Sequence, residues 1–98
     1  MPHDPEAHPT RFRVAPDVHA SVSTDGLVIL DVRGGLVLAS NTIGARIWEL
    51  IERQVDCRDI AAQLARDFGV PVDRTERDVR AFVTALEARG LVSAEPTC

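Results

Sequence analysis

Hydrophobic and polar residues alternate where the foldable part of the chain begins. Over residues 18–23, apolar Val and Ala alternate with polar His and Ser, which predicts a strand with one buried face. Residues 27–32 are almost entirely apolar, which predicts a middle strand that is covered more fully than its neighbours. Residues 36–40 then predict a third strand at the edge of an antiparallel sheet.

The connection between the first two strands decides which faces meet. A two-residue turn at Asp25-Gly26 would bring Asp31 beside Ala20 on an otherwise apolar face. A three-residue turn over 24–26, with Gly26 left-handed in a bulge, avoids this and is favoured. By the same logic, residues 33–35 close the second hairpin. The expected pairs are Val22 with Val28, Ala20 with Leu30 and Val18 with Val32, with Leu36 and Leu38 on the face of Val32 and Leu30.

From residue 41 onward the apolar residues recur with a helical period. Three amphipathic segments follow, and each has a polar start signal and, for the second and third, a glycine stop. In the third, apolar residues at 79, 82, 83 and 86 give the i, i+3, i+4, i+7 spacing of a buried helix face. The expected start residues are Thr42 or Asn41, then Asp56, then Asp73 with Glu76 as a pair resembling a capping box, and the stops are Gly69 and Gly90.

This order predicts an α+β fold of the winged helix-turn-helix type, in which a three-stranded antiparallel sheet is followed by three helices. Residues 17–92 carry the fold, residues 1–16 with four prolines read as a flexible N-terminal tail, and residues 93–98 as a C-terminal tail. Cys57 and Cys98 make no disulfide framework, and there is no secretory or membrane segment. A cytoplasmic location is therefore expected.

The net charge and the charge pattern of the third helix argue against nucleic-acid binding but do not exclude it. Arg supplies all 11 basic residues, yet the net charge is -4, and DNA binding draws much of its affinity from neutralised phosphates. In the third helix Arg74, Arg77 and Arg80 lie opposite the apolar face, but acidic residues at 73, 76 and 78 are interleaved with them. A winged-helix DNA-binding regulator stays open as the alternative function.

Candidate catalytic chemistry is sparse. His19 lies on the polar face of the first strand, and Cys57 lies in a helix first turn without a neighbouring base. Gly34-Gly35 lacks the spacing of a phosphate-binding loop. We therefore expect no catalytic residue, no metal site and no cofactor.

One physical feature does indicate a function. The third strand carries Leu36-Val37-Leu38-Ala39, an apolar edge without proline or charge. Proteins usually protect such edges, and an open one accepts an extended peptide as an additional strand. Two alternatives are that the N-terminal tail covers this edge and that a second copy of the chain pairs with it.

The sequence also resembles the PqqD family. Leu30-Asp31, Gly35 and the run from Asn41 to Trp48 resemble the pattern LD…G…LNxxGAxIW, with Ser40 where the family usually has Leu. Further matches are Asp59-Ile60-Ala61, Leu64, Asp78-Val79, Phe82, Leu86 and Gly90-Leu91-Val92.

The resemblance implies a non-catalytic peptide chaperone that recognises the leader of a ribosomally made precursor peptide. The leader would add to the third strand beside the third helix, and the complex would be presented to a modifying enzyme: a radical-SAM enzyme, as in PQQ biosynthesis, or a leader protease and cyclase, as in lasso-peptide pathways. It also implies structural roles for Gly44, Ala45 and Trp48. A monomer or weak dimer that binds neither nucleic acid nor membrane is expected. The implied peptide-binding residues are Leu36, Val37, Leu38, Ala39, Asp78, Phe82, Ala85 and Leu86.

Overall fold

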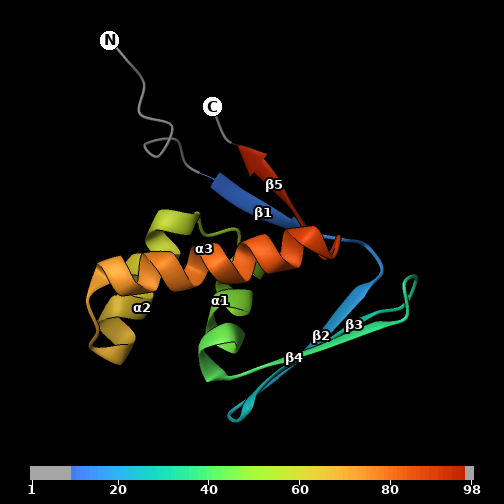
Figure 1. The fold of residues 1–98 in the computed structure, drawn as a ribbon, viewed down its shortest axis with the longest axis horizontal. Coiled ribbons are helices and arrows are strands. Elements are labelled where there is room, and N and C mark those ends of the chain that lie inside the picture. The colour runs from blue at the N-terminus through green and yellow to red at the C-terminus, as the bar shows by residue number, and fades with distance from the viewer. Residues whose placement is uncertain (1–9, 97–98) are drawn as a thin grey trace.

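The computed structural model describes residues 10–96 and confirms the α+β class. A three-stranded antiparallel sheet has the order β2-β3-β4 and is followed in the chain by three helices. Figure 1 shows this sheet extending away from the helices, with a second, two-stranded sheet of β1 and β5 at another side of the helical layer. The elements are β1 (Thr10–Val14), β2 (Val18–Ser23), β3 (Gly26–Asp31), β4 (Leu36–Ser40), α1 (Thr42–Glu52), α2 (Cys57–Phe68), α3 (Val72–Ala88) and β5 (Val92–Pro96).

The strands β1 and β5 lie where the sequence predicted tails. They pair antiparallel, with Val14 opposite Val92, and the Ala15 amide donates to the Leu91 carbonyl at 3.0 Å. Phe12 of β1 is 4% exposed and belongs to the core. The prediction of a tail was therefore wrong for Thr10–Val14 and for most of 93–98, while residues 1–9 and 97–98 lie outside the described residues.

The predicted register between β2 and β3 was wrong. The turn contains only residues 24 and 25, so that Val22 pairs with Leu27 and Ala20 with Ile29. The core face of β3 consists of Leu27 and Ile29, which are 2% and 1% exposed. The prediction placed Val28 and Leu30 on the apolar face. Both side chains point to the opposite side of the sheet and are 49% and 42% exposed.

Two contacts explain this register, one with β4 and one within the following turn. Gly26 begins β3 at φ +153, and a side chain there would overlap the backbone carbonyl of Ser40, so this glycine serves close strand packing rather than the turn. Asp31 does share the core face, but it lies at the end of the strand. There its carboxylate accepts hydrogen bonds from the amides of Arg33 and Gly34, at 3.1 and 3.3 Å. An acidic residue at this position therefore carries little burial cost.

The second hairpin follows from the first. Residues 32–35 form its turn, and Leu38 of β4 pairs with Ile29 rather than lying on the face of Leu30 as predicted. Leu38 is half-buried against the core.

The helix boundaries follow from their caps. Asn41, not Thr42, caps α1, and its side chain accepts from the Gly44 amide at 3.0 Å. Asp56 caps α2 as predicted, and Gly69 ends it in the left-handed conformation at φ +65. The predicted capping pair at the start of α3 was wrong: α3 begins earlier, after Pro71, and has no side-chain cap.

The core lies between the sheet and the three helices. Trp48 of α1 is 0% exposed and is the largest of the fully buried side chains. The α1 helix packs on the inner face of the sheet, and α2 packs against α3. Over residues 10–96, no helix combines the length and the apolar character that crossing a membrane requires. The other core residues are Phe12, Leu27, Ile29, Ala45, Ile47, Leu50, Ile51, Ile60, Ala61, Leu64, Val79, Val83, Leu86, Leu91 and Val92.

Candidate functional site

The outer edge of β4 carries no strand in the described part of the chain. β4 pairs with β3 on one side only, as the sequence predicted for an edge strand. The described part of the predicted N-terminal tail does not cover it, because β1 pairs with β5. Val37, in the middle of β4, is 62% exposed. The backbone groups along this edge are therefore available to an added strand.

Side chains of β4 divide between two faces of the sheet. Leu38 shares the inner face with Ile29, toward the helices, whereas Val37 and Ala39 lie opposite Leu30 and Val28 on the outer face. Leu36 lies opposite Asp31 in the register. Among the described side chains of the predicted edge set, Leu38 lies on the helix side, and Val37 and Ala39 lie on the outer face.

Gly44 holds the end of β4 close to two helices. A methyl group at this position would overlap Ser40 Oγ, and it would lie 2.8 Å from Ser40 Cβ and 3.2 Å from Phe82 Cε1. The absence of a side chain therefore lets α1, α3 and the end of β4 approach one another, as the resemblance implied for this glycine. Ser40 is half-buried, and its small side chain faces Gly44.

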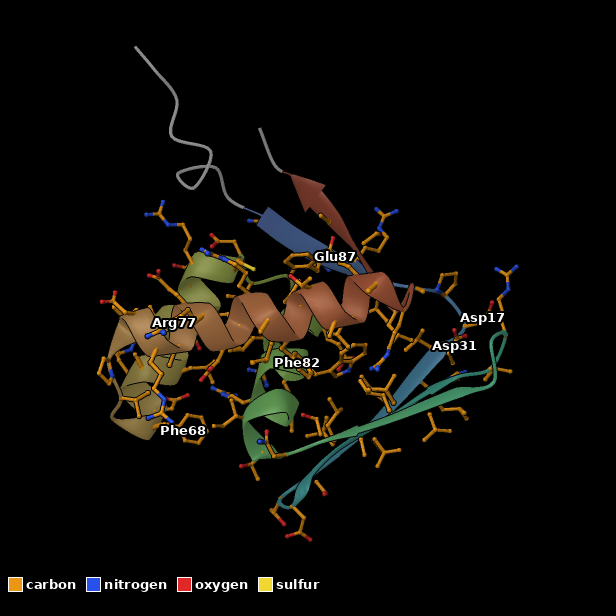
Figure 2. The ribbon with its side chains drawn as sticks, in the orientation of Figure 1. Asp17, Asp31, Phe68, Arg77, Phe82 and Glu87 are labelled. Atoms are coloured by element: carbon orange, nitrogen blue, oxygen red, sulfur yellow. The ribbon has the colours of Figure 1, made fainter. Side chains whose placement is uncertain are left out.

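Three of the predicted residues on α3 share one face. Asp78, Phe82 and Ala85 follow the i, i+4, i+7 spacing, so they line one side of the helix. Asp78 and Ala85 are exposed, and Phe82 is half-buried against the core. In Figure 2, Phe82 lies on the side of α3 that faces the three-stranded sheet. Leu86 is 0% exposed and supports this face from beneath.

An apolar pocket continues this face toward the start of α3. Its volume is about 340 Å³, which includes solvent at the open mouth. Asp78 lines this pocket and is also one of the predicted peptide-binding residues. Phe68 follows Leu64 by four residues, and this spacing predicts a place on the buried face of the second helix, whereas the structure leaves the Phe68 side chain 44% exposed. The pocket is lined by Ile43, Leu64, Phe68, Val70, Arg74, Thr75 and Asp78.

Thr75 is the one buried polar residue recorded for the described chain. Its hydroxyl lies within hydrogen-bonding distance of two carbonyl oxygens, of Ala61 at 2.8 Å and of Val72 at 2.9 Å. This bonding ties the start of α3 to α2 beneath the pocket and satisfies the buried hydroxyl.

Catalytic features are weak in the structure. Burial, with the adjacent Asp56 carboxylate, raises the pKa of the Cys57 thiol to about 11. A thiol with so high a pKa stays protonated near neutral pH and is a poor nucleophile. Among residues 10–96, no three His, Cys, Asp or Glu side chains are grouped in a way that could hold a metal ion.

The arginines of α3 do not form a basic face. Arg74 borders the apolar pocket, while Arg80 lies on another side of the helix, close enough to Cys57 to influence its pKa. Exposed acidic residues at 73, 76 and 78 alternate with these arginines, as they do in the sequence. This mixed charge offers no continuous surface for phosphates.

The described part of the chain thus combines a free strand edge with a partly apolar helix face and a pocket beside its end. The chain belongs to the family of coenzyme PQQ synthesis protein D (PqqD), whose model matches residues 26–92. This match covers the whole span from β3 to the start of β5. A search of curated proteins finds no match.

Two solved structures share the fold. One is "TbiB1 in Complex with the TbiA(beta) Leader Peptide", with a TM-score of 0.77 and 26% identity, covering 83% of this chain and 94% of the other. The second is "Lasso peptide synthetase B1 complexed with the leader peptide", with a TM-score of 0.77 and 29% identity, covering 85% of this chain and 98% of the other. Both similar proteins bind leader peptides, which agrees with the implication drawn from the sequence.

Proposed function

We propose that this chain binds the leader segment of a ribosomally made precursor peptide and presents it to a modifying enzyme. The leader adds as a strand to the free edge of β4, and its inward-facing side chains meet Leu38 and the Asp78, Phe82 and Ala85 face of α3. The observation that carries the proposal is the unpaired β4 edge beside this helix face. Backbone hydrogen bonds supply affinity, and the apolar contacts supply specificity.

Several finer properties belong to the same proposal. The peptide-binding unit comprises residues 17–92 together with the paired strands β1 and β5, which complete its core. It acts in the cytoplasm, as a monomer or weak dimer, without catalysis or a cofactor. Its enzyme partner is a radical-SAM enzyme or a leader protease and cyclase. The similar structure of lasso peptide synthetase B1 with its leader peptide favours the second. No observation favours DNA binding, given the mixed charge of α3 and the net charge of -4.

A binding titration tests this function. The probe is a fluorescein-labelled synthetic leader of the precursor peptide encoded beside this chain's own coding sequence, and the control is a scrambled peptide of identical composition. We expect saturable anisotropy with a Kd between about 1 nM and a few µM for the native order, the range that a short added strand with one or two anchors supports. Equal binding of the scrambled peptide, or none of the native leader, would contradict the proposal.

A further inference from the structure

The apolar pocket at the start of α3 lies immediately beyond the end of the β4 edge. Ile43 of the pocket follows Ser40 by three residues, and Gly44 brings this segment against Phe82. Asp78 lines the pocket and is also one helical turn from Phe82, on the same face of α3. The pocket and the peptide-binding face therefore meet at Asp78 of α3.

The lining of the pocket fits an apolar side chain. Leu64 forms its buried base, while Ile43 and Phe68 remain 37% and 44% exposed at its walls. A guest side chain that covers these exposed apolar side chains removes them from water, which favours binding. The volume of about 340 Å³ includes solvent at the open mouth, so a guest side chain would cover the hollow from outside rather than enter an enclosed cavity.

The rim of the pocket fits the main chain of a peptide. Arg74 and Asp78 are exposed and one helical turn apart, yet no ion pair or side-chain hydrogen bond is recorded for either in the described part of the chain. They offer one hydrogen-bond donor group and one acceptor group. A peptide that leaves the β4 edge at Ser40 loses its strand partner there, and its free carbonyl and amide groups need just such partners.

We infer that this pocket binds an apolar side chain of the leader, at a leader position outside the segment that pairs with β4. This side chain is a second anchor in addition to the strand pairing. The inference rests on the proposed function. Three Cα steps from Ser40 to Ile43 span at most about 11 Å, and an extended guest advances about 3.3 Å per residue. The second anchor therefore lies roughly two to four residues beyond the last strand-paired residue of the leader.

Matched alanine variants test the inference. Phe68→Ala removes a wall of the pocket, and Val72→Ala removes an equally exposed apolar side chain, 42% against 44%, that does not line it. With the labelled leader as probe, we expect Phe68→Ala to weaken binding by about 5- to 30-fold, the loss typical of one interface anchor, and Val72→Ala to change it less than about twofold. Ile43→Ala, on another helix, provides a second pocket variant, and circular dichroism confirms folding.

An alanine scan of the leader completes the test. One apolar leader residue outside the strand-paired segment should weaken binding to the wild-type chain and have no further effect on Phe68→Ala, because the two changes remove the same contact. If the leader binds Phe68→Ala and Ile43→Ala as tightly as wild type, or if all effects add, the pocket is not a leader site although the proposed function stands. Failure of the leader to bind the wild-type chain would refute both.

Discussion

Replacing Gly44 by alanine tests the junction that places β4 beside α3. The new methyl group would overlap Ser40 Oγ and lie 2.8 Å from Ser40 Cβ, inside the 3.4–4 Å of an ordinary contact. Rotation of the serine can move the hydroxyl away but not the Cβ atom, which belongs to the strand. Overpacking of this kind costs about 1–3 kcal/mol, and alanine recovers up to about 1 kcal/mol of helix propensity.

We therefore expect Gly44→Ala to lower the free energy of unfolding by roughly 1–2 kcal/mol. Urea denaturation followed by circular dichroism measures this change directly. In a thermal melt the loss corresponds to a fall of about 4–8 °C per kcal/mol for a chain of this size.

Ser40→Gly supplies the control, because it removes both atoms that the new methyl group meets. In a double-mutant cycle, Gly44→Ala should cost at least about 1 kcal/mol less in the Ser40→Gly background than in the wild type. A Gly44→Ala variant as stable as wild type, or a cycle in which the two changes simply add, would refute the account of this junction.

Three further outcomes follow from individual contacts. In a Cys98→Ser background, Cys57 should react with iodoacetamide at pH 8 at least about tenfold more slowly in the folded chain than in urea. Because the folded pKa of Cys57, about 11, exceeds the unfolded value, the free energy of unfolding should fall as the pH rises from about 9 toward 11. A Cys57 thiol as reactive in the folded chain as in the unfolded chain would contradict this. Successive backbone amides of a strand point to opposite sides, so Val37→Pro and Leu38→Pro should have different effects. One should weaken leader binding by about tenfold or more with the fold retained, and the other should destabilise the β3–β4 ladder. Equal effects of the two variants in binding and melting assays would contradict edge pairing. Thr75→Val leaves a buried carbonyl of α2 without its hydroxyl partner and should cost about 1–3 kcal/mol in urea denaturation, and an unchanged midpoint would show that this hydrogen bond contributes nothing.

Periodicity was sufficient to predict the elements from β2 to α3. Alternation over 18–23 located β2, and the helical spacing after residue 41 located the helices, so their boundaries agree with the structure to within a few residues. The buried face predicted for β2 was wrong, because only Val18 of this strand is half-buried and Val22 is 39% exposed. The side-chain cap at Asp56 and the left-handed Gly69 were predictable for the same reason, because both are local devices.

Features that depend on distant residues were not predictable. The predicted register of β2 with β3 was wrong because Gly26 packs against the Ser40 carbonyl, a contact that exists only once β4 is in place. The pairing of β1 with β5 joins distant parts of the chain, and this partnership leaves no local signal. The alternation Arg-Phe-Arg-Val over 11–14 was a strand signal that the sequence analysis missed, because the prolines around it favoured a tail.

Some parts of the candidate site were predictable from the sequence and others were not. The β4 edge was found from composition alone, because an apolar strand without charge or proline is unusual at an edge. The α3 residues came from family resemblance. The pocket was missed because it is built from the ends of three helices, and Phe68 had the spacing of a core residue although it lies at a helix end beside Gly69. Exposure at a helix end is decided by what packs there, which periodicity does not report.

Hydrogen exchange of the backbone amides, measured with and without saturating leader, tests most directly that β4 receives the peptide. Every second amide of Leu36–Ser40 should gain protection, because these groups point to the open edge, while amides of the other free edge at β2 should stay unchanged. Leader binding without new protection in β4, or with protection at β2 instead, would contradict strand addition at this edge.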